Sequence, residues 1–98
     1  MVLELAKIDI KSGMNAEFEQ YLAQAQAVLQ RADGYISHEF HRCIETPNRY
    51  ILLIKWVSLE AHTEGFRGSE LFTEWRALIG SFFENPPSVE HFELKFSV

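Results

Sequence analysis

The sequence predicts an α+β domain of the ferredoxin-like class, in which one four-stranded antiparallel sheet carries two helices on one face. Segments with strand and helix periodicity follow one another in the order βαββαβ. The turn at residues 45–48 joins the second and third strands in a hairpin. The run from Tyr50 to Trp56 is apolar on both parities, which indicates a strand covered on both faces.

The composition is that of a single globular domain over residues 1–98, with 47% hydrophobic and 23% charged residues. A net charge of −5 and scattered Lys and Arg residues argue against a nucleic-acid surface. The chain has no apolar segment that could span a membrane and no visible export signal after Met1. Together with a single cysteine, Cys43, these features predict a cytoplasmic protein without an internal disulfide.

The first strand is expected from Leu3 to Ile10, with Leu3 and Leu5 on one face and Ala6, Ile8 and Ile10 on the other. A helix should follow from residue 15. Its apolar stripe recurs at steps of four and three residues and consists of Phe18, Leu22, Ala25, Leu29 and Ala32.

Polar residues mark both ends of this first helix. Asn15 is the predicted N-cap, and Asp33-Gly34 should supply the left-handed stop. The second strand, Tyr35–Ile44, is mixed in polarity and pairs with the apolar third strand. Because that third strand needs a cover on each face, we expect two sheets to pack face to face in a homodimer.

The second helical region begins after Ser58, a predicted N-cap, and glycines at 65 and 68 weaken its first part. Ser69 is expected to cap a second segment. Gly80 and then, firmly, residues 85–87, Asn-Pro-Pro, end it, and the last strand is expected over Ser88–Val98. The apolar stripe of this second segment is Leu71, Phe72, Trp75, Leu78, Ile79 and Phe82.

Histidine and cysteine positions give no metal-ligand motif. His38 and His41 are three residues apart on a strand, so they face opposite sides and no metal site is expected. Cys43 shares a strand parity with His41, but a small buried thiol is the commoner role for a lone cysteine.

Residues 62–69 hold the side chains best suited to chemistry. Arg67 lies between two glycines before a helix N-terminus, where it could bind an anion or pair with Glu64 or Glu70. His62 can share a helix face with Phe66, where it would either exchange a proton near neutral pH or serve as a buried structural residue. The aromatic residues nearby form core or the wall of a pocket for a flat ligand.

From Leu3 to about Phe96 the chain resembles the antibiotic biosynthesis monooxygenase domain family, whose members are dimeric α+β barrels. The resemblance rests on residues 11–15 with Phe18, 33–35, 50–56 with 58–62, 66–69 with Phe72, and 75–76. It implies a small-molecule oxygenase that uses O2 as co-substrate without flavin, metal or haem. Electron-rich polycyclic phenols, anthrones or quinols are the implied substrates. Haem-degrading relatives use an Asn on the first strand and a Trp and a His around the second helix. The corresponding positions here are near Ala6, Phe66 and Arg76, so haem degradation is not expected.

On this resemblance we expect His62 to act as base and Arg67 to stabilise phenolate or superoxide charge. The expected substrate pocket consists of Tyr50, Trp56, Phe66, Phe72 and Trp75. Two alternatives stay open. One is an isomerase or cyclase that needs only acid and base groups on the same fold. The other is a non-enzymatic dimeric protein for small-molecule binding or stress response, in which His62 is structural.

Overall fold

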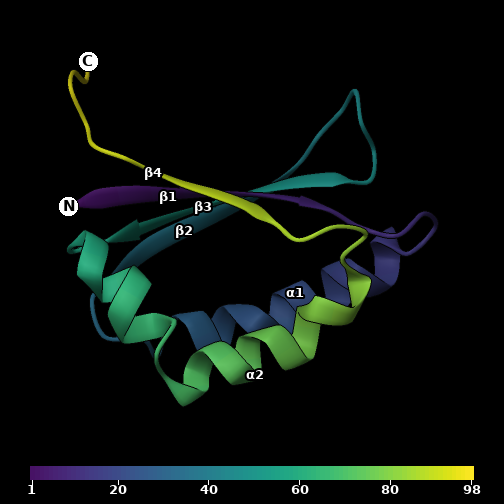
Figure 1. Cartoon of the computed structure of the whole chain (residues 1–98). Coiled ribbons are helices and arrows are strands. Elements are labelled where there is room, and N and C mark those ends of the chain that lie inside the picture. The colour runs from purple at the N-terminus through teal and green to yellow at the C-terminus, as the bar shows by residue number, and fades with distance from the viewer.

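The computed structural model describes residues 1–98 and shows one sheet with a helical layer on a single face (Figure 1). The strands are β1 (Val2–Asp9), β2 (Tyr35–Arg42), β3 (Arg49–Trp56) and β4 (Ser88–Phe92). Helices α1 (Asn15–Leu29) and α2 (Glu70–Ile79) form the layer, with a π-helical turn η1 (Ala61–Phe66) and a 3₁₀ turn η2 (Gly80–Phe82) flanking α2. The antiparallel order β2-β3-β1-β4 confirms the ferredoxin-like class.

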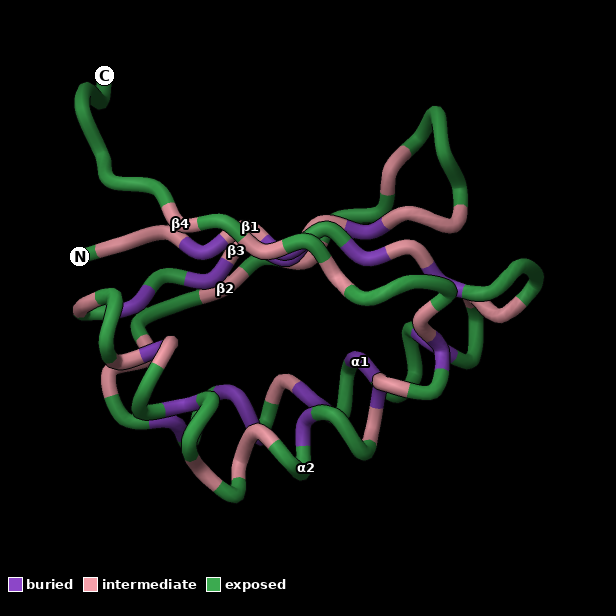
Figure 2. The backbone as a smooth tube through the Cα atoms, in the orientation of Figure 1, coloured by how far each residue is buried: buried purple, intermediate pink, exposed green.

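The core lies between the sheet and the helices, where buried segments of the two layers face each other (Figure 2). Alternate residues of β1 and β3 point into it because side chains on a strand alternate between the faces of the sheet. The strand residues buried there are Glu4, Ala6, Ile8, Tyr50, Leu52, Ile54 and Trp56. One of them, Glu4, is acidic.

Helix α1 buries the predicted stripe, but it begins differently from the prediction. Met14 occupies the N-cap position, and Asn15 is already helical. The Asn15 amide donates hydrogen bonds to the Pro47 carbonyl oxygen at 2.9 Å and to the Tyr50 hydroxyl at 3.0 Å. The N-cap prediction for Asn15 was therefore wrong, because a tertiary contact with the hairpin takes the side chain that a cap would need.

The second helical region also departs from expectation at one cap. Ser58 Oγ accepts the Ala61 N–H at 3.1 Å, as predicted. Ser69 stands at the N-cap position of α2 without capping it, because its hydroxyl donates to the Phe66 carbonyl oxygen at 2.7 Å.

The last strand is shorter than predicted. It ends at Phe92, whose partner on β1 is Leu3, and β1 itself begins only one residue earlier. Pairing therefore stops where the partner strand stops. The remaining residues leave the body of the molecule at its C-terminus, and the Phe96 side chain is 94% exposed (Figure 1). No helix has the length and apolar character needed to cross a membrane.

Gly34 ends the α1–β2 connection with a φ of +84°, and an added Cβ would lie 2.6 Å from Ala61 Cβ. We expect Gly34→Ala to lower the free energy of unfolding by about 2 kcal/mol, from left-handed backbone strain plus overpacking. Gly13 is the matched control, since its φ is +81° but no atom lies within 4 Å of an added Cβ. Gly13→Ala should cost about 1 kcal/mol in urea unfolding. Equal losses would contradict the contact with Ala61.

Candidate functional site

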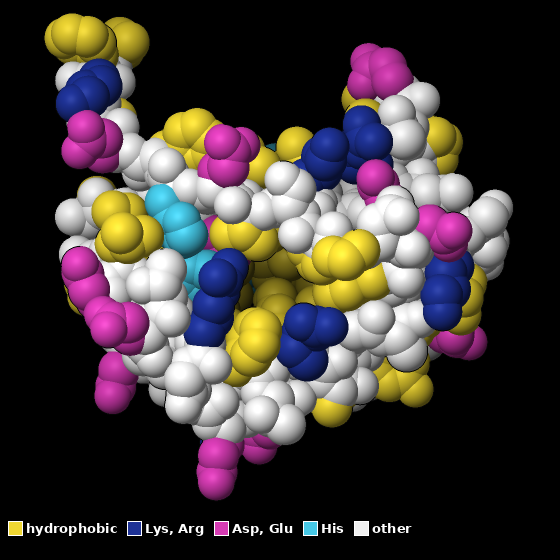
Figure 3. All heavy atoms as spheres, in the orientation of Figure 1, with side chains coloured by type: hydrophobic (Ala, Val, Ile, Leu, Met, Phe, Trp, Pro, Cys, Tyr) yellow, Lys and Arg dark blue, Asp and Glu magenta, His cyan; other side chains and the backbone are white.

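A cavity of about 340 Å³ opens between the inner face of the sheet and the α2 side of the helical layer. Viewed from its mouth, it is a hollow with an apolar interior and basic side chains beside it (Figure 3). Its sheet side is lined by Ala6, Ile8, Leu52, Ile54 and Val89, and its helix side by Phe66, Phe72 and Trp75, with Phe83 nearby. Such walls suit a flat apolar ligand.

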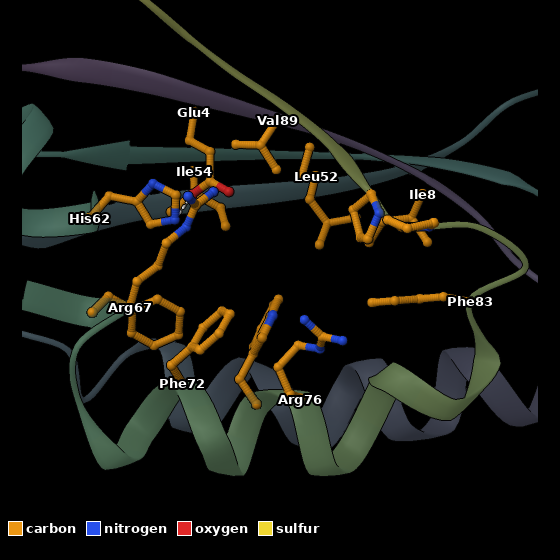
Figure 4. Close-up of a pocket in the computed structure, with 15 residues that line it drawn as sticks. Glu4, Ile8, Leu52, Ile54, His62, Arg67, Phe72, Arg76, Phe83 and Val89 are labelled. Atoms are coloured by element: carbon orange, nitrogen blue, oxygen red, sulfur yellow. Dashed lines mark ion pairs between the residues drawn. The ribbon is translucent and has the colours of Figure 1, made fainter. Parts of the chain in front are cut away.

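Four polar side chains interrupt these apolar walls: Glu4, His62, Arg67 and Arg76. Glu4 reaches from the sheet toward His62 and Arg67, while Arg76 rises from α2 (Figure 4). Glu4, on β1, and His62, in η1, are deeply buried, with 5% and 3% of their surfaces exposed. Both arginines are exposed at the mouth.

The residues expected from sequence fall into two groups. His62, Arg67, Phe66, Phe72 and Trp75 line the cavity. Tyr50 and Trp56 do not.

Tyr50 lies on the α1 side of the sheet. Its ring packs against Phe18 at a centroid distance of 4.8 Å, and its hydroxyl donates to Glu19 Oε2 at 2.6 Å. Trp56 is fully buried behind the cavity wall, and its indole nitrogen donates to Glu4 Oε1 at 2.9 Å. Tyr50 is thus separate from the cavity, whereas Trp56 supports a residue that lines it.

The π-helical turn explains how His62 and Arg67 both reach the cavity. The Arg67 N–H donates to the His62 carbonyl oxygen at 3.1 Å, which closes the wider turn. Gly68 follows, where a Cβ would lie 2.5 Å from the Glu64 carbonyl oxygen, so only glycine fits without a shift. Arg67 forms no salt bridge with Glu64 or Glu70, which leaves its guanidinium free to meet a ligand.

Glu4 is a polar cavity residue that was not predicted from the sequence. Burial raises the pKa of its carboxyl to about 7, although the Trp56 hydrogen bond and the nearby Arg67 charge oppose the increase. A carboxyl group with such a pKa exchanges protons near neutral pH. Its register partners are Ile54 on β3 and His91 on β4. The signal that could have found it is strand parity, because Glu4 shares the face of Ala6, Ile8 and Ile10 and is acidic.

His62 lies between two ionisable groups. Its Nδ1 is hydrogen-bonded to His91 Nε2 at 2.8 Å, and its Nε2 lies 3.2 Å from Glu4 Oε1. Burial, followed by Arg67 and His91, lowers the pKa of His62 to about 4. The imidazole is therefore neutral at pH 7, and the contact with Glu4 is not an ion pair at that pH.

Arg76 was also not identified from the sequence as a site residue. Its guanidinium lies 5.9 Å from the centroid of the Phe72 ring and 5.5 Å from that of Phe83. These cation–π contacts hold the cation at the cavity mouth without an acidic partner.

No group of three or more His, Cys, Asp or Glu side chains is arranged to hold a metal ion. Glu4, His62 and His91 do lie together, but they form a line, with His62 in the middle and one ring nitrogen directed to each neighbour. Metal ligands must instead converge on one point.

Comparisons of the sequence and of the structure with known proteins find the same family. The family model described as antibiotic biosynthesis monooxygenase matches residues 1–78. The uncharacterized protein YczJ of Bacillus subtilis is 45% identical over 93 residues, covering 95% of this chain and 98% of its own. A Bordetella bronchiseptica structure that bears the family's name has a TM-score of 0.94 at 39% identity, over 97% of both chains.

A more distant structure is SnoaB, a cofactor-independent oxygenase from Streptomyces nogalater. It superposes with a TM-score of 0.84 at 18% identity, over 99% of this chain and 95% of SnoaB. At that identity the likeness is one of fold.

Proposed function

Since this chain belongs to the antibiotic biosynthesis monooxygenase family, we propose that it is a monooxygenase that oxidises an electron-rich aromatic or quinol-type molecule with O2, without flavin, metal or haem. One observation carries the proposal. A single cavity combines an ionisable pair, Glu4 and His62, with the cation Arg67 and an aromatic wall. The fold shared with SnoaB, a cofactor-independent oxygenase, supports it further.

The chemistry needs little from the protein. Triplet O2 reacts slowly with closed-shell molecules, but a deprotonated phenol or enol can donate one electron to it. The Glu4–His62 pair would take the proton, Arg67 would stabilise the enolate and then superoxide, and the apolar walls would exclude water.

An anthrone illustrates the balance of the reaction. Loss of one methylene proton leaves the electron pair on the substrate as an enolate. One electron passes to O2, and the resulting radical and superoxide combine to form a C–O bond. The peroxide takes up a proton and then loses water, so that CH2 plus O2 becomes C=O plus H2O. The substrate supplies all the electrons.

Oxygen uptake over a panel of hydroquinones and anthrones tests the proposal. We expect His62→Ala and Arg67→Ala to lower kcat/KM by about 100-fold, because each removes a group beside the developing charge. Arg31→Ala is the control, since Arg31 pairs with Glu74 on the exposed helical surface. Equal rates in all four proteins would remove the site assignment. Product formed equally fast under nitrogen would instead support an isomerase or cyclase that uses the same acid–base pair.

We also propose that the protein is a homodimer joined through the outer face of its sheet. That face carries Leu3, Leu5, Ile51 and Leu53, which are only partly buried, and Phe92, which is 45% exposed. An apolar groove of about 450 Å³ continues from it along the C-terminal residues. A second copy with the same face would bury both.

Leu53→Glu should convert this dimer into a monomer at micromolar concentration, because it would bury like charges against each other across the two-fold axis. Size-exclusion chromatography with light scattering measures the result. Gln24→Glu is the control, since residue 24 is exposed on α1. A wild-type protein that is already monomeric would contradict the assembly.

The substrate is a small molecule in this proposal, with neither nucleic acid nor a membrane as partner. The chain has nine Lys and Arg residues and fourteen Asp and Glu residues, and this negative balance disfavours binding to a polyanion such as nucleic acid. We propose a cytoplasmic location, which the single cysteine, Cys43, supports.

A further inference from the structure

Glu4 has one carboxylate oxygen held by the protein and one left for the cavity. Oε1 accepts the Trp56 indole N–H at 2.9 Å and lies 3.2 Å from His62 Nε2. Oε2 receives no hydrogen bond from the protein. Because no fully buried side-chain oxygen or nitrogen lacks a partner, Oε2 must be accessible from the cavity that Glu4 lines. This is the geometry of a base directed at a ligand.

His62 is in the opposite situation. Its Nδ1 is engaged by His91 and its Nε2 faces the Glu4 carboxyl. Its ring is also stacked on Trp56 at a centroid distance of 5.1 Å, which fixes its orientation. His91, on β4, is opposite Glu4 in the strand register and is only partly buried. His62 therefore contacts the Glu4 carboxyl directly, and His91 holds His62 in place through its hydrogen bond.

We propose that Glu4 is the catalytic base of this site, that its Oε2 takes the substrate proton, and that His62 and His91 are positioning residues. The inference rests on the function proposed above and names the atom that starts it. The substrate C–H or O–H bond breaks, the electron pair stays on the substrate, and the Oε2–H bond forms. The same proton is then available to the peroxide.

The charges around Glu4 fit this role. His62 faces it from η1, Arg67 from the position just after η1, and His91 from β4, while β3 contributes only Trp56 and Ile54. Arg76 lines the same cavity from α2. Burial raises the pKa of Glu4 to about 7, where a base can both accept and return a proton at physiological pH. The pKa of His62, at about 4, makes it a weak base by comparison.

The first test is kcat/KM for oxygen uptake with anthrone across pH 5 to 9. We expect Glu4→Gln to lose 100-fold or more above pH 7, and this loss to shrink below pH 7, where the wild-type carboxyl is itself protonated. Glu4→Asp should fall between Glu4→Gln and wild type. Glu17→Gln, a matched change on the exposed face of α1, should leave the rate unchanged. A Glu4→Gln rate within tenfold of wild type at pH 8 would overturn the proposal.

A second variant separates the base from its neighbours. Trp56→Phe removes the hydrogen bond that lowers the pKa of Glu4, so the acidic limb of the pH profile should move up by about one pH unit. His62→Gln should lower the rate but keep an acidic limb. An unmoved limb in Trp56→Phe, with no limb left in His62→Gln, would make His62 the base.

An anaerobic measurement tests proton removal by Glu4 independently of the reaction with O2. Under nitrogen at pH 8, bound anthrone should show the enolate absorption band in wild-type protein and lack it in Glu4→Gln. That result without oxygen uptake would keep Glu4 as base and reject the monooxygenase. Oxygen uptake that persists in Glu4→Gln would keep the monooxygenase and reject Glu4 as its base. The absence of an enolate band in wild-type protein would also overturn the assignment of Glu4.

Discussion

Glu4→Gln is expected to stabilise the folded protein at alkaline pH and to change little at acidic pH. Burial raises the pKa of Glu4 to about 7 from its ordinary value of 4.5, so the folded state holds this proton more tightly than the unfolded state. The stability that the protonated carboxyl contributes is present below pH 4.5 and is lost as pH rises through 7. The gain from Glu4→Gln over wild type should grow by roughly 3 kcal/mol from pH 4 to pH 8.

Urea unfolding at matched protein concentration measures this difference, in which all other titrating groups largely cancel. His62 supplies an internal check of opposite sign. Its folded pKa of about 4 lies below the usual 6.5, so its contribution to stability increases as pH rises through that interval. His62→Gln should therefore lose stability relative to wild type as pH rises from 4 to 6.5. Parallel curves for all three proteins would show that neither side chain is buried as described.

Ala6→Phe is expected to abolish turnover by filling the cavity. Ala6 is on the inner face of β1 and lines the cavity between Leu52 and Val89, its partners in the strand register. A phenyl ring there would occupy space that a flat substrate needs, and we expect kcat/KM to fall by about 100-fold or more, which corresponds to roughly 3 kcal/mol. Oxygen uptake and anaerobic quenching of tryptophan fluorescence measure turnover and binding.

Ala27→Phe is the matched control for this change. Residue 27 is exposed on α1, so the same added ring stays in solvent and should alter neither turnover nor binding. Far-UV circular dichroism checks that both variants fold. Substrate binding that survives unchanged in Ala6→Phe would mean that catalysis takes place outside this cavity.

The fold could be predicted because its signals are local. Strand alternation, the stripe from Phe18 to Leu29 and the left-handed Gly34 each depend on neighbouring residues, and each appears in the structure. The errors arose where distant residues decide the outcome. Asn15 binds the β2–β3 hairpin instead of capping its helix, and the last strand stops where β1 offers no further partner.

The candidate site was predictable only in part, for the same reason. His62, Arg67 and Phe66 are close in sequence, so one segment could be identified as carrying them. Glu4 and His91 come from opposite ends of the chain and meet His62 only through the β1–β4 register. Tyr50 shares the inner face of the sheet with Glu4, but it lies under α1, and no periodicity distinguishes the part of the sheet under α1 from the part under α2.

The proposed roles of Glu4 and His62 depend on their protonation states, and one NMR titration measures both. In protein labelled with ¹³C at the Glu side-chain carboxyl and at the His ring, the resonances would be assigned with Glu4→Gln and His62→Gln. We predict a Glu4 midpoint near pH 7 and a His62 ring that stays neutral from pH 5 to 8. A Glu4 midpoint near its ordinary value of 4.5, with His62 titrating near 6.5, would contradict the proposed roles of both residues.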